Sequence, residues 1–231
     1  MFQVINMFGL LRQEVEKYVE EKGLYFDGVI IEVKEKHYET YVSVDVSNDK
    51  ENLFHEIIEG ISSTFEKNVY GYNEQNVYTC AFNLLKQRGK KLAIAESVTA
   101  GRLCSEFVGN NEGASSVLLE GIVCYSVKSK CARFGIEPSF FEQNSPQSAE
   151  TSKTLAYGLL RYSGADITIA TTGYASSTNQ DANNGEAFVA IGLNTGTYTQ
   201  RVRFFGTRNH IMQQIAKFAF AFLIKLLTKS N

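Results

Sequence analysis

Histidine and paired cysteines, which build most metal sites and many catalytic triads, are scarce in this sequence. Its 231 residues include three histidines, His37, His55 and His210, which lie far apart along the chain. The four cysteines form no Cys-x-x-Cys pair and lie in apolar surroundings, a pattern typical of free thiols in a reducing compartment. We therefore expect no metal and no cofactor. With so few and such widely separated histidines, a Ser-His-Asp triad is not favoured either.

Targeting and membrane-spanning patterns are also missing. The N-terminal stretch MFQVINMFG lacks the basic region and the long apolar region of a signal peptide. The most apolar stretch near the end, residues 218–227, is interrupted by Lys225 and is shorter than the roughly 20 residues that span a bilayer. We expect a cytoplasmic protein that has no membrane partner.

Charge is divided unevenly along the chain, although the formal net charge is only −2. Residues 1–75 carry seven basic and fifteen acidic side chains, a net charge of −8, whereas residues 76–231 carry sixteen and ten, a net charge of +6. Hydrophobic residues make up 44% of the sequence, which is ample for packed cores. The split indicates two units, the second better suited to an anionic small molecule, unless the charges only solvate two faces.

The first unit, residues 1–70, has the pattern of a small α+β domain. Helical spacing of apolar residues predicts helices over 11–21 and 51–66. Between them the runs GVIIEVKE and YETYVSVDVS predict two strands. The unit has no basic Gly-x-x-Gly loop, so we expect no nucleic-acid partner and interpret it as a spacer or interaction module.

The second unit, residues 75–231, alternates helical and strand-like segments. Helices are predicted over 74–88, 99–109, 126–134, 148–163 and 208–228, and strands over 91–95, 117–125 and 166–171, followed by the runs GEAFVAIGL and TYTQRVRFF. This alternation predicts a three-layer α/β/α domain, and its sheet is expected to be mixed because the last two runs resemble a hairpin.

Polar residues follow three of these predicted strands at the points where the strands end. Glu96-Ser97 follows the first, Tyr125-Ser126 the second, with Lys130 just beyond, and Thr172-Gly173 ends the third. Ligands of such folds gather at the carboxyl ends of the strands. A lysine with a depressed pKa can activate a serine, and a tyrosine can relay the proton, so Ser-Lys-Tyr is a candidate site. Hydroxyl residues at strand ends are also common caps.

Four motifs add a family resemblance to this pattern. AESVTAGRL, GASSVLLEGIVCYSVKSK, GADITIATTGYA and FFGTRNHI follow one another at fitting distances. Together they resemble the CinA C-terminal domain family, the PncC-type nicotinamide-nucleotide amidohydrolases, over about residues 75–229. Residues 1–70 resemble the small KH-like domain that precedes that domain in CinA. The resemblance implies hydrolysis of the amide of nicotinamide mononucleotide to the nicotinate nucleotide and ammonia.

The resemblance also implies roles for individual residues. Ser97 matches the nucleophile of the family, and Tyr125 and Lys130 match its tyrosine and lysine. The remaining residues that match, or adjoin matches, are expected to bind substrate: Glu96, Thr99, Gly101, Thr172, Gly173 and Arg208. The N-terminus of the helix behind Ser97 is expected to favour the phosphate of the nucleotide.

The chain departs from the family pattern in the loop over residues 174–184. There YASSTNQDANN replaces a Gly-Pro-Gly-Gly-rich segment, so we expect a less ordered loop and weak or redirected activity. A non-catalytic, dimeric ligand- or partner-binding relative is the alternative. The resemblance implies a homo-oligomer, and the predicted helix over 211–227 has a second apolar face with Phe220 and Ile224 that we expect to contact the partner.

Overall fold

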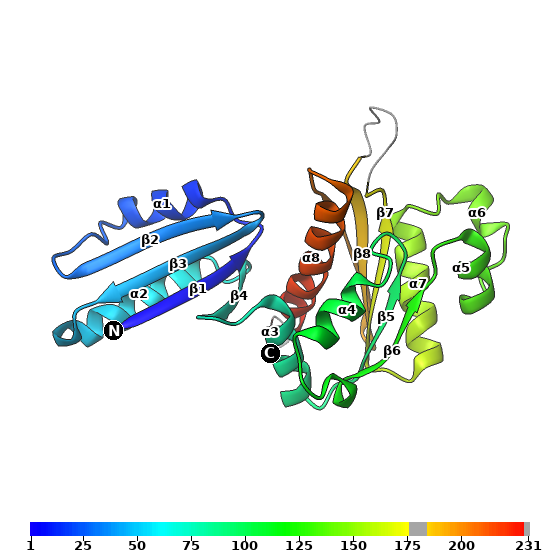
Figure 1. Ribbon diagram of the computed structural model, residues 1–231, viewed down its shortest axis with the longest axis horizontal. Coiled ribbons are helices and arrows are strands. Elements are labelled where there is room, and N and C mark those ends of the chain that lie inside the picture. Colours follow the sequence, from blue (N-terminus) through cyan, green and yellow to red (C-terminus); the bar gives the residue numbers. More distant parts are fainter. Residues whose placement is uncertain (176–183, 229–231) are drawn as a thin grey trace. The chain divides into compact units, whose positions relative to one another are not determined.

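The computed structural model describes residues 1–175 and 184–228 (Figure 1). The chain divides into two compact units. The first comprises Met1–Cys80 together with the C-terminal residues from Ile224, and the second comprises Ala81–Leu223. Each unit is described by itself.

The first unit is a four-stranded antiparallel sheet with two helices. Its elements are β1 (Phe2–Phe8), α1 (Arg12–Glu21), β2 (Val29–Lys36), β3 (Glu39–Val46), α2 (Glu51–Thr64) and β4 (Val69–Tyr72). The strand order β2-β3-β1-β4 is that of two interleaved, or split, β-α-β units. One core, which includes Ile5, Val15, Val44 and Ile57, joins the helices to one face of the sheet.

The predicted α+β class of this unit is confirmed, but only two of its four strands are predicted from the sequence. β1 and β4 were missed, although β1 is a central strand and pairs with β3 from Phe2↔Asp45 to Phe8↔Glu39. The KH-like resemblance of this region stays a prediction.

The second unit has a five-stranded mixed sheet with helices on both faces. Its strands are β5 (Leu92–Glu96), β6 (Leu118–Val123), β7 (Ile167–Gly173), β8 (Glu186–Leu193) and β9 (Gly196–Arg203). Its helices are α3 (Val77–Gln87), α4 (Arg102–Gly109), α5 (Val127–Phe134), α6 (Phe140–Gln143), α7 (Ala149–Ser163) and α8 (Arg208–Thr228), of which the first residues of α3 and the last of α8 fall in the first unit. The sheet order is β6-β5-β7-β8-β9, with β6, β5 and β7 parallel and the last two strands antiparallel. The predicted three-layer fold and the hairpin are therefore confirmed.

Helices α4 and α8 cover one face of this sheet and α7 covers the other (Figure 1). On the first face the rings of Phe107 and Phe220 stack with centroids 5.2 Å apart, and Phe82 of α3 meets Phe107 edge-on. On the second face Leu155 and Leu159 of α7 pack on Ala93 and other small strand residues. The small side chains let α7 lie close to the sheet.

The strand order positions the site. β5 is the first strand of the sheet along the chain, β6 lies on one side of it and β7 on the other. The chain reaches β6 through α4, on one face, and returns to β7 through α7, on the opposite face. A crevice opens where neighbouring connections diverge in this way, and here it lies at the carboxyl end of β5, immediately before Ser97.

Helix α8 is longer than the apolar stretch that was expected near the end of the sequence, and it differs from the prediction in which side chains it exposes. It is 21 residues long and, by length and composition alone, apolar enough to cross a membrane, but 56% of its most apolar window is buried, as in a core helix. Phe220 and Ile224, which were expected to face a partner, are buried within the chain. The dimer therefore stays a prediction without this face as its basis.

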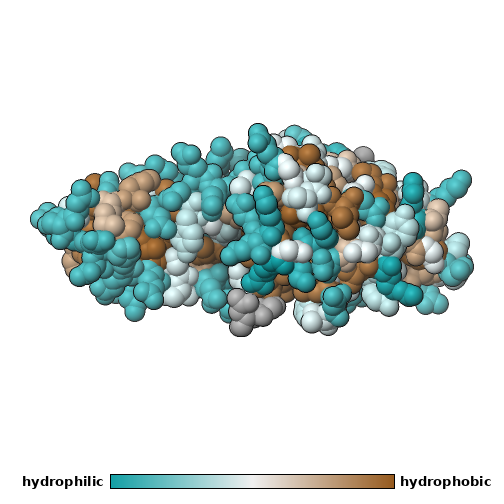
Figure 2. Space-filling model, turned by 90° about the horizontal axis from the view of Figure 1, so that it is seen from below, coloured by the Kyte–Doolittle hydropathy of each residue, from teal (hydrophilic) through white to brown (hydrophobic). Residues whose placement is uncertain are grey.

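Across the surface seen in Figure 2, hydrophilic residues are spread widely, with hydrophobic residues between them.

Candidate active site

The loop that carries Ser97 is held by the last residue of β5. The Glu96 carboxylate is fully buried and accepts backbone N–H groups of Gly101, Leu103 and Cys104 at 2.9, 3.0 and 2.9 Å. A strand residue thus caps the N-terminus of α4, whose own N-cap, Gly101, has no side chain to do so. The expectation that this helix N-terminus receives a phosphate is wrong, because Glu96 already occupies these N–H groups.

Neighbouring bonds fix Ser97 itself at the end of β5. The backbone N–H of Ser97 donates to the Thr171 carbonyl at 3.0 Å, and the Ser97 carbonyl accepts the N–H of Ala100 in a tight turn. The hydroxyls of Thr99 and Thr171 meet at 2.8 Å beneath this turn. Ser97 is 7% exposed, so its hydroxyl lies in a confined setting.

Lys130 reaches Ser97 from α5, the helix that follows β6. Its ammonium nitrogen, Nζ, lies 3.0 Å from Ser97 Oγ, 2.9 Å from the Cys124 carbonyl oxygen and 3.3 Å from the Tyr125 carbonyl oxygen. The side chain is 1% exposed, which confirms the prediction that Lys130 is buried beside Ser97. Lys128, two residues earlier, is exposed.

Burial lowers the pKa of Lys130 below its ordinary value of 10.5. The opposing influence is the Cys124 thiol, which would favour the ammonium form if it were ionised. Burial raises the pKa of that thiol to about 11, so it is neutral near pH 7. The hydrogen-bond partners of Lys130 in the described chain are a hydroxyl and two carbonyls, and they include no carboxylate. None of these partners carries a negative charge that would stabilise the ammonium form as an ion pair.

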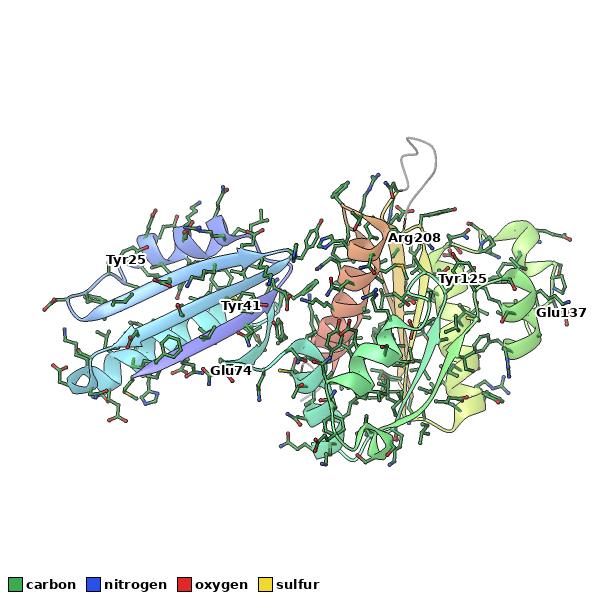
Figure 3. The ribbon with its side chains drawn as sticks, in the orientation of Figure 1. Tyr25, Tyr41, Glu74, Tyr125, Glu137 and Arg208 are labelled. Atoms are coloured by element: carbon green, nitrogen blue, oxygen red, sulfur yellow. The ribbon has the colours of Figure 1, made fainter. Side chains whose placement is uncertain are left out.

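Tyr125 and Arg208 form a second polar pair at the same end of the sheet (Figure 3). An Arg208 guanidinium N–H donates to Tyr125 Oη at 3.0 Å. The Tyr125 side chain is 59% exposed, and it is its backbone carbonyl, not its hydroxyl, that contacts Lys130. The sequence predicts a tyrosine that relays the proton or orients Ser97 or Lys130, so here the structure differs, because the hydroxyl contacts Arg208.

The end of β7 supplies the remaining wall. Thr172 Oγ1 donates to the Pro146 carbonyl at 2.7 Å and so ties the 145–148 segment to this strand. Gly173 has φ 148°, and a Cβ there would lie 2.3 Å from the Glu186 carbonyl oxygen of β8. Only glycine therefore permits this approach of the two strands.

A pocket of about 190 Å³ opens above Ser97. It is lined by Ser97, Val98, Tyr125, Gln147, Gly173, Tyr174, Ala175 and Arg208. Four of the predicted site residues line it, Ser97, Tyr125, Gly173 and Arg208, and Lys130 contacts Ser97 from behind.

The other predicted substrate-binding residues, Glu96, Thr99, Gly101 and Thr172, do not line the pocket. The described contacts of Glu96, Thr99 and Thr172 bind neighbouring segments together, so they support the walls of the pocket.

Gln147, Tyr174 and Ala175 line the pocket without having been predicted from the sequence. Gln147 precedes a predicted helix that carried no other chemical signal, and the Thr172–Pro146 hydrogen bond ties its segment to the end of β7. Most of the divergent 174–184 loop lies outside the described residues, as does the prediction about its order. Within the described ranges, no group of three His, Cys, Asp or Glu side chains could hold a metal ion.

Comparisons with known proteins bear on both units. The profile of the CinA C-terminal domain family matches residues 74–227. A CinA-like protein of Kosmotoga olearia is 28% identical over 239 residues, which span 97% of this chain and 56% of that protein. This chain therefore spans about half the length of that relative.

Two solved structures match the fold as well. A CinA superfamily protein from Klebsiella pneumoniae has a TM-score of 0.62 and 28% identity, with 67% of this chain and 99% of that chain covered. A competence or damage-inducible protein from Enterobacter asburiae has a TM-score of 0.61 and 26% identity, with the same coverage. Nearly all of each solved chain is thus matched by two thirds of this one.

Proposed function

We propose that this chain, which belongs to the CinA C-terminal domain family, hydrolyses the amide of nicotinamide mononucleotide to the nicotinate nucleotide and ammonia. The observation that carries the proposal is the buried contact between Lys130 Nζ and Ser97 Oγ, 3.0 Å apart. A serine hydroxyl attacks an amide effectively only when a base removes its proton, and Lys130 is a base within reach.

The hydrogen-bond partners of Lys130 can also hold a neutral amine. Such an amine has two N–H groups and one lone pair, and the carbonyls of Cys124 and Tyr125 accept the two N–H groups. Lys130 Nζ donates to Ser97 Oγ at 3.0 Å, and we propose that in the neutral amine the lone pair takes this position and accepts the Ser97 O–H instead. Burial lowers the pKa of Lys130 and so shifts the amine toward the neutral form that a general base needs.

In the proposed reaction Ser97 Oγ attacks the carboxamide carbon, and the Ser97 proton passes to Lys130 Nζ. The Val98 backbone N–H, which has no partner in the described chain and belongs to a residue lining the pocket, supports the oxyanion. The C–N bond then breaks, and the proton held by Lys130 leaves with the amine as ammonia. Lys130 next takes a proton from a water, whose oxygen attacks the ester carbon, and gives that proton to Ser97 Oγ as the ester C–O bond breaks and the nicotinate nucleotide leaves.

Arg208 supplies positive charge for the anionic part of this substrate. Its guanidinium lines the pocket together with Tyr125, the hydroxyl of which it orients. Guanidinium groups bind phosphate through paired N–H donors, so we assign the substrate phosphate to Arg208. Tyr125 stays a candidate catalytic residue through its hydroxyl, which lies on the same side of the pocket as Arg208.

The test is release of ammonia from nicotinamide mononucleotide by the purified full chain. Ser97→Ala is expected to lower kcat/KM by at least about a thousandfold, because the nucleophile is lost. Lys128→Ala is the matched control, because Lys128 lies on α5 with Lys130 but is exposed, and it is expected to keep wild-type turnover.

Two results would contradict the proposal. One is a folded Ser97→Ala variant with wild-type turnover, which would remove Ser97 as the nucleophile. The other is a folded wild-type chain that binds the nucleotide but releases no ammonia, and it would favour the non-catalytic, ligand-binding alternative.

A further inference from the structure

Gln147 lies on a segment that several hydrogen bonds hold in place, although the proposed reaction does not use this residue. It lines the pocket with Ser97 and Arg208. Its segment is held at three points: Thr172 Oγ1 donates to the Pro146 carbonyl at 2.7 Å, Thr151 Oγ1 donates to the Ser145 carbonyl at 2.8 Å, and the Ser148 hydroxyl caps α7. A side chain on so constrained a segment has a defined position before any ligand arrives.

The side-chain amide of Gln147, a residue that lines the pocket, is held by Ser145. Ser145 Oγ accepts the Gln147 backbone N–H at 3.1 Å and donates its own proton to Gln147 Oε1 at 3.3 Å. The Oε1 acceptor is thereby used, whereas the Nε2 group has no partner in the described part of the chain and keeps two N–H donors. The pocket is therefore offered a donor from this side chain.

The sheet order places this donor apart from Arg208. Ser97 and Val98 follow the middle strand, β5, and Tyr125 with its partner Arg208 stands beside the end of β6. Gln147 is tied to the end of β7, on the opposite side of β5. The pocket thus has a cationic wall and an uncharged donor wall, with the nucleophile between them.

We propose that Gln147 is a specificity-determining residue that donates a hydrogen bond to the carboxamide oxygen of the substrate, while Arg208 binds the phosphate. The inference rests on the proposed function for the identity of the substrate. An uncharged N–H donor suits an amide oxygen, because it holds the group without favouring the carboxylate product as strongly as a cation would. Gln147 therefore recognises the carboxamide, which is the part of the ligand that reacts.

Binding measurements test this without requiring turnover. Calorimetry on the Ser97→Ala chain compares nicotinamide mononucleotide with nicotinamide riboside, which has the same carboxamide but no phosphate. Adding Gln147→Ala is expected to weaken both ligands by the same factor, about tenfold, the worth of one hydrogen bond. Gln147→Glu, which replaces the donor with an acceptor, is expected to weaken both further, and Gln143→Ala, an exposed neighbour outside the pocket, to change neither.

Arg208→Ala supplies the opposite pattern, in which binding of the nucleotide weakens and binding of the riboside does not. A Gln147→Ala loss confined to the phosphate-bearing ligand, no loss at all, or no binding of either ligand would overturn the inference. Ammonia release by the wild-type chain is read separately, so an inactive enzyme that shows the Gln147 pattern would overturn the proposed function alone.

Discussion

Both units bury an ionisable side chain against hydroxyl groups, but they do so in opposite ways. In the first unit the Glu39 carboxyl is 3% exposed and accepts the Tyr70 hydroxyl at 2.8 Å. Burial, reinforced by the Glu39 charge, raises the pKa of Tyr70, which therefore keeps its proton and its bond. In the second unit Lys130 is buried against Ser97, and burial lowers the pKa of the amine.

The difference separates a structural group from a reactive one. Tyr70 and Glu39 are a donor and an acceptor that satisfy each other, so burial stabilises the arrangement as it stands. Lys130 has two carbonyls for its N–H groups and a hydroxyl at its third position, in a pocket open to a ligand. Burial there lowers the pKa of the lysine, whose nitrogen contacts the hydroxyl that the proposed function makes the nucleophile.

The largest effect expected from breaking this comparison is on turnover. Lys130→Met keeps a long apolar side chain but removes the base, and kcat/KM for nicotinamide mononucleotide is expected to fall at least about a thousandfold. Glu39→Gln, the matched change in the first unit, is expected to leave kcat/KM within about twofold of wild type. Comparable losses of kcat/KM in the two variants, measured by ammonia release on folded protein, would contradict the distinction between a reactive Lys130 and a structural Glu39.

A smaller effect, on stability, is expected at Glu96. Glu96→Ala leaves three N–H groups at the start of α4 without their acceptor, and the free energy of unfolding is expected to fall by about 4 kcal/mol. Urea unfolding followed by circular dichroism measures this. A loss below about 1 kcal/mol would show that Glu96 does not hold the loop, and its expected role as a substrate-binding residue would regain support.

The smallest effect is expected in the first unit. Tyr70→Phe removes the hydroxyl that Glu39 accepts, and the free energy of unfolding is expected to fall by about 2 kcal/mol with no change in turnover. The same unfolding experiment, with the ammonia assay beside it, checks both parts. Lost turnover at unchanged stability would mean that the first unit takes part in the reaction.

Much of the second unit follows from local patterns in the sequence. The apolar run at Leu92 predicts β5, and the polar residues after each strand predict a shared site, because parallel strands bring their carboxyl ends to one edge. The proximity of Lys130 to Ser97 needed only the α5 helix directly after β6. These features depend on short-range chain geometry.

Other features depend on partners far along the chain. Gln147 enters the pocket through a hydrogen bond between Thr172 and Pro146, 26 positions apart. The capping role of Glu96 depends on where α4 begins in space. β4 has only four residues, too few for a periodic signal, and it is recognised through its pairing with β1. No local pattern contains this information.

The most direct test of the central claim, that Lys130 activates Ser97, is the pH dependence of Ser97 labelling. A serine-directed fluorophosphonate, followed by intact-protein mass spectrometry, reads the nucleophile without needing the substrate. One label on Ser97 is expected, with a rate that rises with pH and levels off above the pKa of Lys130, which burial holds below 10.5. The rise should disappear in Lys130→Met and persist in Lys128→Met. Equal labelling rates in wild type and Lys130→Met, or a label on a residue other than Ser97, would contradict the claim.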